Sequence, residues 1–267
     1  MKVNVGISTA SYYSLLETED AVREILKFNV SCCEVFLETY SEYSVDFGKL
    51  VKSRLNGMSA VSMHARTQHF ETDIFGKSPR QKRDGFDWLR RALDAGHELG
   101  VKYYVYHGPM TIRSDKPIAP LAEDIERANE LATERGILLC WETVSWCAIH
   151  SPERLREAAE CCPNIGFVID IKQCIETGRD PAEFVRAAGS RAKHVHAMDY
   201  DARGVHALPG KGVTDFAKLK RELDAVGYGG SVILEPYAVH AQDETAMRES
   251  IEYLRRIFEE LKDGPRE

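Results

Sequence analysis

The chain has 267 residues, of which 43% are hydrophobic and 29% charged, and its formal net charge is −7. This composition is that of a globular protein with a sizeable core, and an acidic chain without a basic tract argues against nucleic acid as a partner. No run approaches the ~20 apolar residues that span a bilayer, so we expect no membrane partner. The first residues lack a signal-peptide pattern and the seven cysteines include no CxxC pair, so we expect a cytoplasmic protein with reduced thiols.

Short apolar runs alternate with amphipathic stretches along the whole chain. The runs are almost continuously hydrophobic, which is typical of parallel strands buried on both faces. The amphipathic stretches begin at polar caps and several end at glycine, which is typical of helices. In chain order, the predicted strands and helices pair as 3–9 with 18–28, 32–38 with 44–57, 58–65 with 78–100, 101–108 with 122–136, 137–144 with 151–162, 165–171 with 180–189, 192–199 with 214–227, and 231–237 with 243–262.

These eight pairs predict an α/β fold, a (β/α)8 TIM barrel that forms a single domain over residues 1–267. A doubly wound open sheet is the competing fold, and the absence of a GxGxxG turn after the first strand counts against it. Gly48 disfavours the helix predicted over 44–57, because glycine lowers helix propensity. In a TIM barrel the functional groups lie at the C-terminal ends of the strands.

Four charged or imidazole side chains stand at the ends of the last four predicted strands. They are Glu142, Asp170, His196 and Glu235. A charged side chain at the end of a buried strand destabilises the fold unless the charge is compensated. A single acidic residue at the end of a strand is more often an ion-pair partner or a helix cap, but four consecutive strands with the same ending predict a metal site. Carboxylates with one imidazole suit a single divalent ion, Mn²⁺, Mg²⁺, Co²⁺ or Zn²⁺, and we expect no organic cofactor.

Further histidines stand at the ends of two other predicted strands and in the loop after the seventh strand. His64 and His107 end the third and fourth strands, and each is either a packed core residue or a contact to substrate or to a second metal. The loop after the seventh strand adds His206 and, within the segment LPGKG, Lys211. The glycines of this segment are explained by a turn better than by a phosphate cradle, because the longer P-loop pattern is missing.

The strand-end motifs resemble those of the xylose isomerase-like TIM barrel superfamily, which includes sugar isomerases and epimerases, inosose dehydratases and endonuclease IV. The resemblance covers essentially the whole chain. The matching motifs are MHA at 63–65, HGP at 107–109, WET at 141–143, HxHxxD at 194–199, LPGKGVTDF at 208–216 and LEPY at 234–237.

The resemblance implies roles for individual residues. The metal ligands that it implies are Glu142, Asp170, His196 and Glu235. His64 and His107 match positions that touch substrate in the sugar enzymes and hold a further zinc in the endonucleases, and His206 matches a loop histidine. Glu34 matches a common acidic position, for which we expect a hydrogen-bonding role.

Two departures from the family pattern bear on function. Many relatives have Asp-x-x-His on the sixth strand, and this chain has Gln173 where that histidine would stand. Gly204 replaces an acidic residue of the endonuclease pattern. These losses and the negative charge argue against DNA repair, although a two-metal site with His64, His107 and a bridging Glu142 is allowed by the residues.

The resemblance implies an enzyme. The favoured hypothesis is a metal-dependent isomerase or epimerase of a sugar or sugar phosphate. Glu142 and Glu235 would be the acid/base pair, with a metal-stabilised enediolate between them. Gln173, His206 and Arg203 are predicted substrate contacts together with the two strand-end histidines. The alternatives are an inosose dehydratase-like lyase on the same site, or a barrel that binds sugar without turnover. The partner is a small sugar or polyol, and the sequence is compatible with a homo-oligomer.

Overall fold

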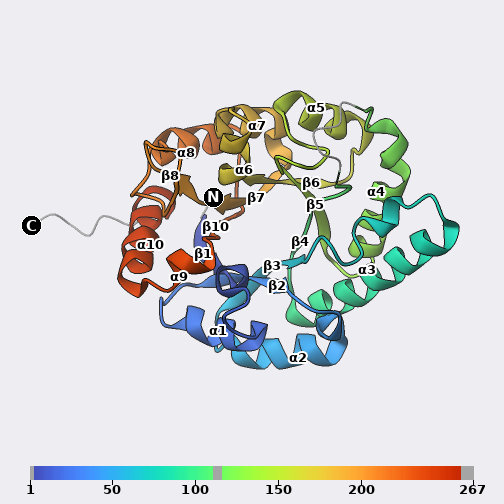
Figure 1. The fold of residues 1–267 in the computed structure, drawn as a ribbon, viewed down its shortest axis with the longest axis horizontal. Helices are drawn as coiled ribbons and strands as arrows, with labels where there is room; N and C mark the ends of the chain where they lie inside the picture. The colour runs from blue at the N-terminus through green and yellow to red at the C-terminus, as the bar shows by residue number, and fades with distance from the viewer. Residues whose placement is uncertain (1–2, 111–115, 260–267) are drawn as a thin grey trace, which may run out of the picture.

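The computed structural model describes residues 3–110 and 116–259, and these form a closed barrel of eight parallel strands surrounded by helices (Figure 1). The strands follow one another around the barrel in the order β1, β10, β7, β6, β5, β4, β3, β2. Their bounds are β1 Asn4–Ser8, β2 Cys32–Leu37, β3 Ser59–Ala65, β4 Tyr103–Tyr106, β5 Leu138–Glu142, β6 Gly166–Asp170, β7 Ala192–Ala197 and β10 Ser231–Leu234. The predicted (β/α)8 barrel is therefore confirmed.

Helices separate the strands as predicted. The outer helices are α1 Thr18–Leu26, α2 Val45–Arg54, α3 Pro79–Leu99, α4 Ala122–Thr133, α5 Pro152–Cys161, α7 Pro181–Ala188, α8 Phe216–Ala225 and α10 Glu244–Phe258. Local chemistry sets their ends: the Ser44 hydroxyl accepts the N–H of Phe47 at the start of α2, and Gly100 ends α3 with φ of 81°. The last helix was predicted to reach residue 262, and residues 260–262 lie outside the described part of the chain.

Short elements that the sequence pattern did not predict lie at the C-terminal end of the barrel. They are α6 Ile171–Glu176, α9 Ala238–Ala241, and the antiparallel pair β8 Asp199–Tyr200 and β9 His206–Ala207. Helix α6 begins directly after β6 because the carboxylate of Asp170 accepts the N–H of Gln173 and caps it. Among the described residues, no helix has the length and apolar character needed to cross a membrane.

Gly48 is in α2 because two helices approach closely there. A Cβ at this position would lie 2.6 Å from the carbonyl oxygen of Ala95 and 3.0 Å from the Cβ of Glu98, both in α3. We therefore expect Gly48→Ala to lower the free energy of unfolding by about 1–3 kcal/mol through overpacking, although alanine is the better helix former. Urea unfolding measures the change, with the exposed Lys49→Ala in the same helix as the control. A Gly48→Ala variant that is more stable than the wild type would contradict this close packing.

Candidate metal centre

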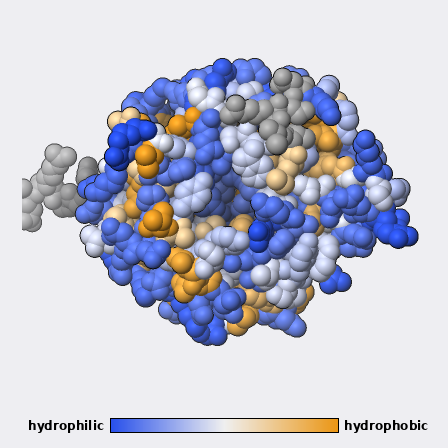
Figure 2. All heavy atoms as spheres, viewed as in Figure 1, coloured by the Kyte–Doolittle hydropathy of each residue, from blue (hydrophilic) through white to orange (hydrophobic). Residues whose placement is uncertain are grey.

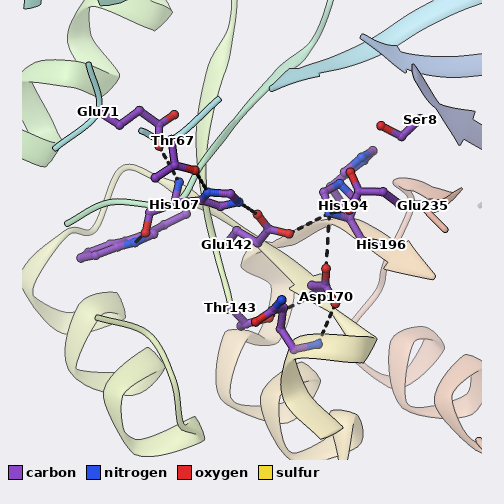
Figure 3. Close-up of polar contacts among 12 residues, drawn as sticks. Ser8, Thr67, Glu71, His107, Glu142, Thr143, Asp170, His194, His196 and Glu235 are labelled. Carbon is purple, nitrogen blue, oxygen red and sulfur yellow. Dashed lines mark hydrogen bonds and ion pairs between the residues drawn. The ribbon is translucent and has the colours of Figure 1, made fainter. Parts of the chain in front are cut away.

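The four predicted strand-end ligands come together at the C-terminal end of the barrel. Glu142 and Asp170 are the last residues of β5 and β6, His196 is the penultimate residue of β7, and Glu235 directly follows β10. These four strands are neighbours in the barrel, and Asp170 is paired in register with His196. One candidate ligand atom from each residue lies within 4.8 Å of the others. Figure 3 shows Glu142, Asp170 and Glu235 arranged around the ring of His196.

One ring nitrogen of His196 faces three carboxylates. This nitrogen, Nδ1, lies 2.7 Å from Glu142 Oε1, 3.4 Å from Glu235 Oε2 and 3.9 Å from Asp170 Oδ2. The side chains of His196, Glu142 and Asp170 are almost completely buried, and that of Glu235 is 13% exposed. Three acidic groups this close in a buried place repel one another unless a cation compensates them. Oxygen donors with one imidazole therefore fit a divalent metal ion here.

The two glutamates of this cluster experience opposite electrostatic effects. Burial raises the pKa of Glu235 to about 7, although the imidazole of His196 acts against this rise. Burial also acts on Glu142, but His196 and His107 outweigh it and hold the pKa of this carboxyl well below its ordinary value. Burial likewise raises the pKa of Asp170. Carboxyls whose environments separate their pKa values in this way are typical of functional sites.

The structure brings His107 and His64 to the same cluster. His107 Nε2 lies 2.6 Å from Glu142 Oε2, and its Nδ1 contacts the hydroxyl of Thr67. The ring of His64 meets that of His107 edge-on at 4.4 Å between centroids. His64 is buried, and neither ring nitrogen has a hydrogen-bond partner among the described residues. Buried imidazole nitrogens normally have partners, so the two nitrogens of His64 are available to a metal or a substrate. His64, His107 and Glu142 also form a candidate metal-binding group.

The side chains of the remaining predicted substrate contacts are bound to other residues of the protein. Gln173 accepts hydrogen bonds with Oε1 from the N–H and the hydroxyl of Ser145, at 2.9 and 2.7 Å. His206 is bonded to the hydroxyl of Tyr200 at 2.8 Å, on the rim of the barrel. Arg203 is not brought to the cluster: its side chain is 82% exposed and its guanidinium is paired with Asp201 in the same loop. Substrate binding by these three residues stays a prediction.

Glu34 organises the interior beneath the cluster. Its fully buried carboxylate accepts hydrogen bonds from the hydroxyls of Ser8 and Ser62, at 3.1 and 2.8 Å. The same carboxylate lies 3.1 Å from Nε2 of both His194 and His196. A carboxylate that holds Nε2 of a histidine leaves Nδ1 to face a metal and fixes the ring orientation. The sequence signal was an acidic residue within the apolar run CCEVFL.

We expect Glu34→Gln to weaken Mn²⁺ binding by about 10- to 100-fold, because the amide holds His196 less well and lowers its basicity. Titration of the metal-free protein with Mn²⁺ measures the affinity. Ser8→Ala is the matched control, since it removes one hydrogen bond to Glu34 and leaves both imidazoles paired. Equal affinities of Glu34→Gln and the wild type would show that other contacts orient His196.

Two other residues near the cluster gave no clear signal in the sequence. Glu71, in the loop after β3, is fully buried and accepts the backbone N–H of His107 at 3.1 Å and the hydroxyl of Tyr104 at 3.1 Å. Burial raises its pKa to about 7. Thr67, in the same loop, contacts the ring of His107 (Figure 3). This loop therefore positions His107 through its side chain and its backbone N–H, and these contacts form only in the folded chain.

A cavity opens beside the cluster at the C-terminal end of the barrel. Its volume is about 540 Å³. The polar groups that line it include Ser14, His107, Lys172 and Glu235, and its apolar wall includes Tyr13, Phe36, Tyr237 and Val239. Figure 2 shows this end of the barrel hollowed at its centre, with hydrophilic residues inside and hydrophobic residues on part of the rim. Glu235 therefore joins the metal cluster to a space that a small molecule can enter.

The fold and this cluster define a (β/α)8 barrel with a carboxylate–imidazole cluster, a candidate metal centre, at the C-terminal ends of its strands. The chain belongs to the xylose isomerase-like TIM barrel family, whose model matches residues 22–257.

Comparisons with individual proteins give more distant similarities. The chain is 23% identical to the inosose dehydratase of Geobacillus thermodenitrificans over 163 residues, which are 54% of this chain and 53% of that protein. It thus spans about half the length of the curated relatives that it matches first. Two solved structures share its fold across nearly the whole chain. They are D-psicose 3-epimerase with D-tagatose from Clostridium cellulolyticum H10 (16% identity, TM-score 0.79, 96% of this chain and 100% of that one) and the IOLI protein with a zinc atom (17% identity, TM-score 0.74, 96% of each chain).

Proposed function

We propose that the protein is a divalent-metal-dependent isomerase or epimerase of a sugar or sugar phosphate, with Glu142 and Glu235 as its acid/base pair. The observation that carries this proposal is the convergence of both glutamates with Asp170 and His196 in one cluster, from which Glu235 lines the cavity. When bound, a divalent ion supplies Lewis acidity that makes a C–H next to a carbonyl easier to deprotonate. Proton removal from such a carbon needs a positioned base, and return of the proton needs an acid.

The side chains of this protein supply both proton-transfer groups. Glu235 lines the cavity, and the rise of its pKa toward neutrality suits a group that takes and returns a proton. One oxygen of Glu142 is hydrogen-bonded to His196 at 2.7 Å, and the other lies 2.6 Å from Nε2 of His107, so both imidazoles restrict the orientation of this carboxylate. The apolar wall with Tyr13 and Phe36 can shield one face of a bound sugar from water.

A lyase of the inosose dehydratase type is the second candidate, and the similarity in sequence to inosose dehydratases favours it. Such a reaction starts with removal of the same kind of proton, and the β-hydroxyl then leaves in place of reprotonation. The two reactions need the same base, so the four clustered residues support both. Similarity of fold to D-psicose 3-epimerase supports the first candidate.

A screen of ketoses, phosphorylated ketoses and inososes with the Mn²⁺-loaded protein tests the proposal. A new epimer or isomer in the NMR spectrum supports the first candidate, whereas a product that absorbs in the ultraviolet as an unsaturated or dicarbonyl compound supports the lyase. Sugar binding without any product and without exchange of a C–H proton would contradict both and leave a non-catalytic binding protein.

A further inference from the structure

The side chain of Gln173 is turned away from the cavity. Gln173 stands three residues after Asp170 in α6. Its amide oxygen is occupied by two hydrogen bonds from Ser145, and Gln173 is absent from the described residues that line the cavity. The side chain therefore ties α6 to the loop after β5.

Lys172, one residue earlier, does line the cavity together with Glu235 and His107. The residue is only 7% exposed. Its Nζ lies 3.9 Å from Asp170 Oδ2, beyond hydrogen-bond distance, and 4.7 Å from the centre of the Tyr237 ring. The ammonium makes no hydrogen bond to the described residues, although it has three N–H donors. A lysine this buried is rare without a partner. Here the partners are the long ion pair to Asp170 and the face of the Tyr237 ring, and neither accepts a hydrogen bond from the ammonium. Its N–H donors are therefore available to a molecule in the cavity.

We propose that Lys172 is a substrate-binding residue, whose ammonium donates a hydrogen bond to an oxygen of the substrate and stabilises negative charge on it. The inference rests on the proposed function, in which a proton is removed next to a carbonyl. In that step the C–H proton moves to a glutamate carboxylate and the electron pair moves onto the carbonyl oxygen. The ammonium keeps its proton throughout. Reprotonation of carbon returns the pair and restores the glutamate.

The chemistry of an ammonium narrows the class of substrate. A histidine or glutamine can both donate and accept hydrogen bonds, whereas Lys172 only donates. It therefore favours a carbonyl or ionised oxygen as its partner. The wall that includes Tyr13 and Phe36 suits the C–H face of a ring or chain. A small polyhydroxy carbonyl compound has both features.

Lys172 could instead serve only as a counter-ion that holds Asp170. The two roles differ in what the loss of the ammonium does to metal binding. Removing a counter-ion that positions Asp170 disturbs the metal ligand and weakens Mn²⁺ binding. Removing a substrate-binding cation leaves Mn²⁺ binding unchanged or tighter, because a like charge beside the metal is lost.

Glycolohydroxamate is a suitable probe, because it chelates divalent metals and carries the paired oxygens of a deprotonated hydroxycarbonyl compound. We would measure its Kd by calorimetry on the full chain saturated with Mn²⁺, and the Kd of Mn²⁺ separately. Lys172→Met is expected to weaken the probe by about 10- to 100-fold, the loss of one charge-assisted hydrogen bond, without weakening Mn²⁺. Lys172→Arg is expected to recover part of the loss. Lys218→Met, which removes an exposed positive charge from α8, is the control.

Each other outcome has a definite meaning. A wild type that binds Mn²⁺ and the probe, with Lys172→Met equal to it, overturns this inference and leaves the proposed function intact. A parallel loss of Mn²⁺ and probe in Lys172→Met overturns it in favour of the counter-ion role. A larger effect of Gln173→Ala than of Lys172→Met also overturns it. A wild type that binds no Mn²⁺ overturns the proposed function and this inference together.

Discussion

Glu235→Gln is expected to lower the rate at which a C–H proton of the substrate exchanges with solvent by about 10²- to 10⁴-fold, the usual contribution of a general base. Glutamine keeps the size of the side chain and one oxygen, but it cannot accept the proton. Glu142→Gln is expected to have an effect of the same order, because a reaction that moves a proton between two faces needs both groups. Incorporation of deuterium from heavy water, followed by NMR, measures the exchange even when the product is not yet known.

Metal content has to be measured beside exchange, since both glutamates belong to the metal cluster. Assays at saturating Mn²⁺ separate a lost base from a lost ligand. The exposed Glu130→Gln in α4 is the control for removal of one negative charge. Undiminished exchange in both Glu142→Gln and Glu235→Gln would refute their assignment as the acid/base pair.

Removal of metal is expected to abolish turnover and to lower the stability of the protein. Without a cation, three carboxylates face one another around His196 at the buried end of the barrel. Addition of Mn²⁺ at about 100 times its Kd stabilises the folded state by about 2.7 kcal/mol, which for a chain of this size corresponds to a rise in Tm of roughly 5–10 °C. Differential scanning calorimetry after treatment with a chelator, with and without Mn²⁺, measures the shift. The Asp170→Asn variant is expected to show a much smaller rise in Tm on addition of Mn²⁺.

Elemental analysis of the purified protein decides the number of metals. One equivalent of Mn, Mg, Co or Zn per chain, lost in Glu235→Gln, is the expected result. Two equivalents of zinc would indicate a second site at His64, His107 and Glu142, and His64→Ala would then remove one equivalent. No metal after loading would mean that the cluster at the strand ends is structural, and the central proposal would be wrong.

The sequence predicted the barrel because the patterns that indicate each strand and helix are local and recur along the chain. Near-continuous apolar runs of 4–8 residues favour buried parallel strands, and eight of them in alternation with amphipathic helices leave few folds open. The four metal-cluster residues could be predicted for a related reason. The C-terminal ends of parallel strands meet at one end of a barrel, so Glu142, Asp170, His196 and Glu235 had to converge if their strands formed.

Tertiary structure decided the direction of side chains in loops and short helices. The sequence placed Gln173, Arg203 and Lys172 near the site without separating them. In the folded chain Gln173 is held by Ser145 and Arg203 by Asp201, whereas Lys172 lines the cavity. Periodicity carries no information on such contacts, because they depend on partners elsewhere in the chain.

Long-range contacts also explain Glu34, Glu71 and Gly48. Glu34 meets His194 and His196 across about 160 residues of sequence, and Gly48 is required by the approach of α3. The sequence by itself thus determined the barrel and its ring of strand-end ligands, whose positions follow from strand order. Only the folded chain decided which neighbours orient those ligands and which cation faces the cavity, because these depend on distances between segments that the sequence pattern does not encode.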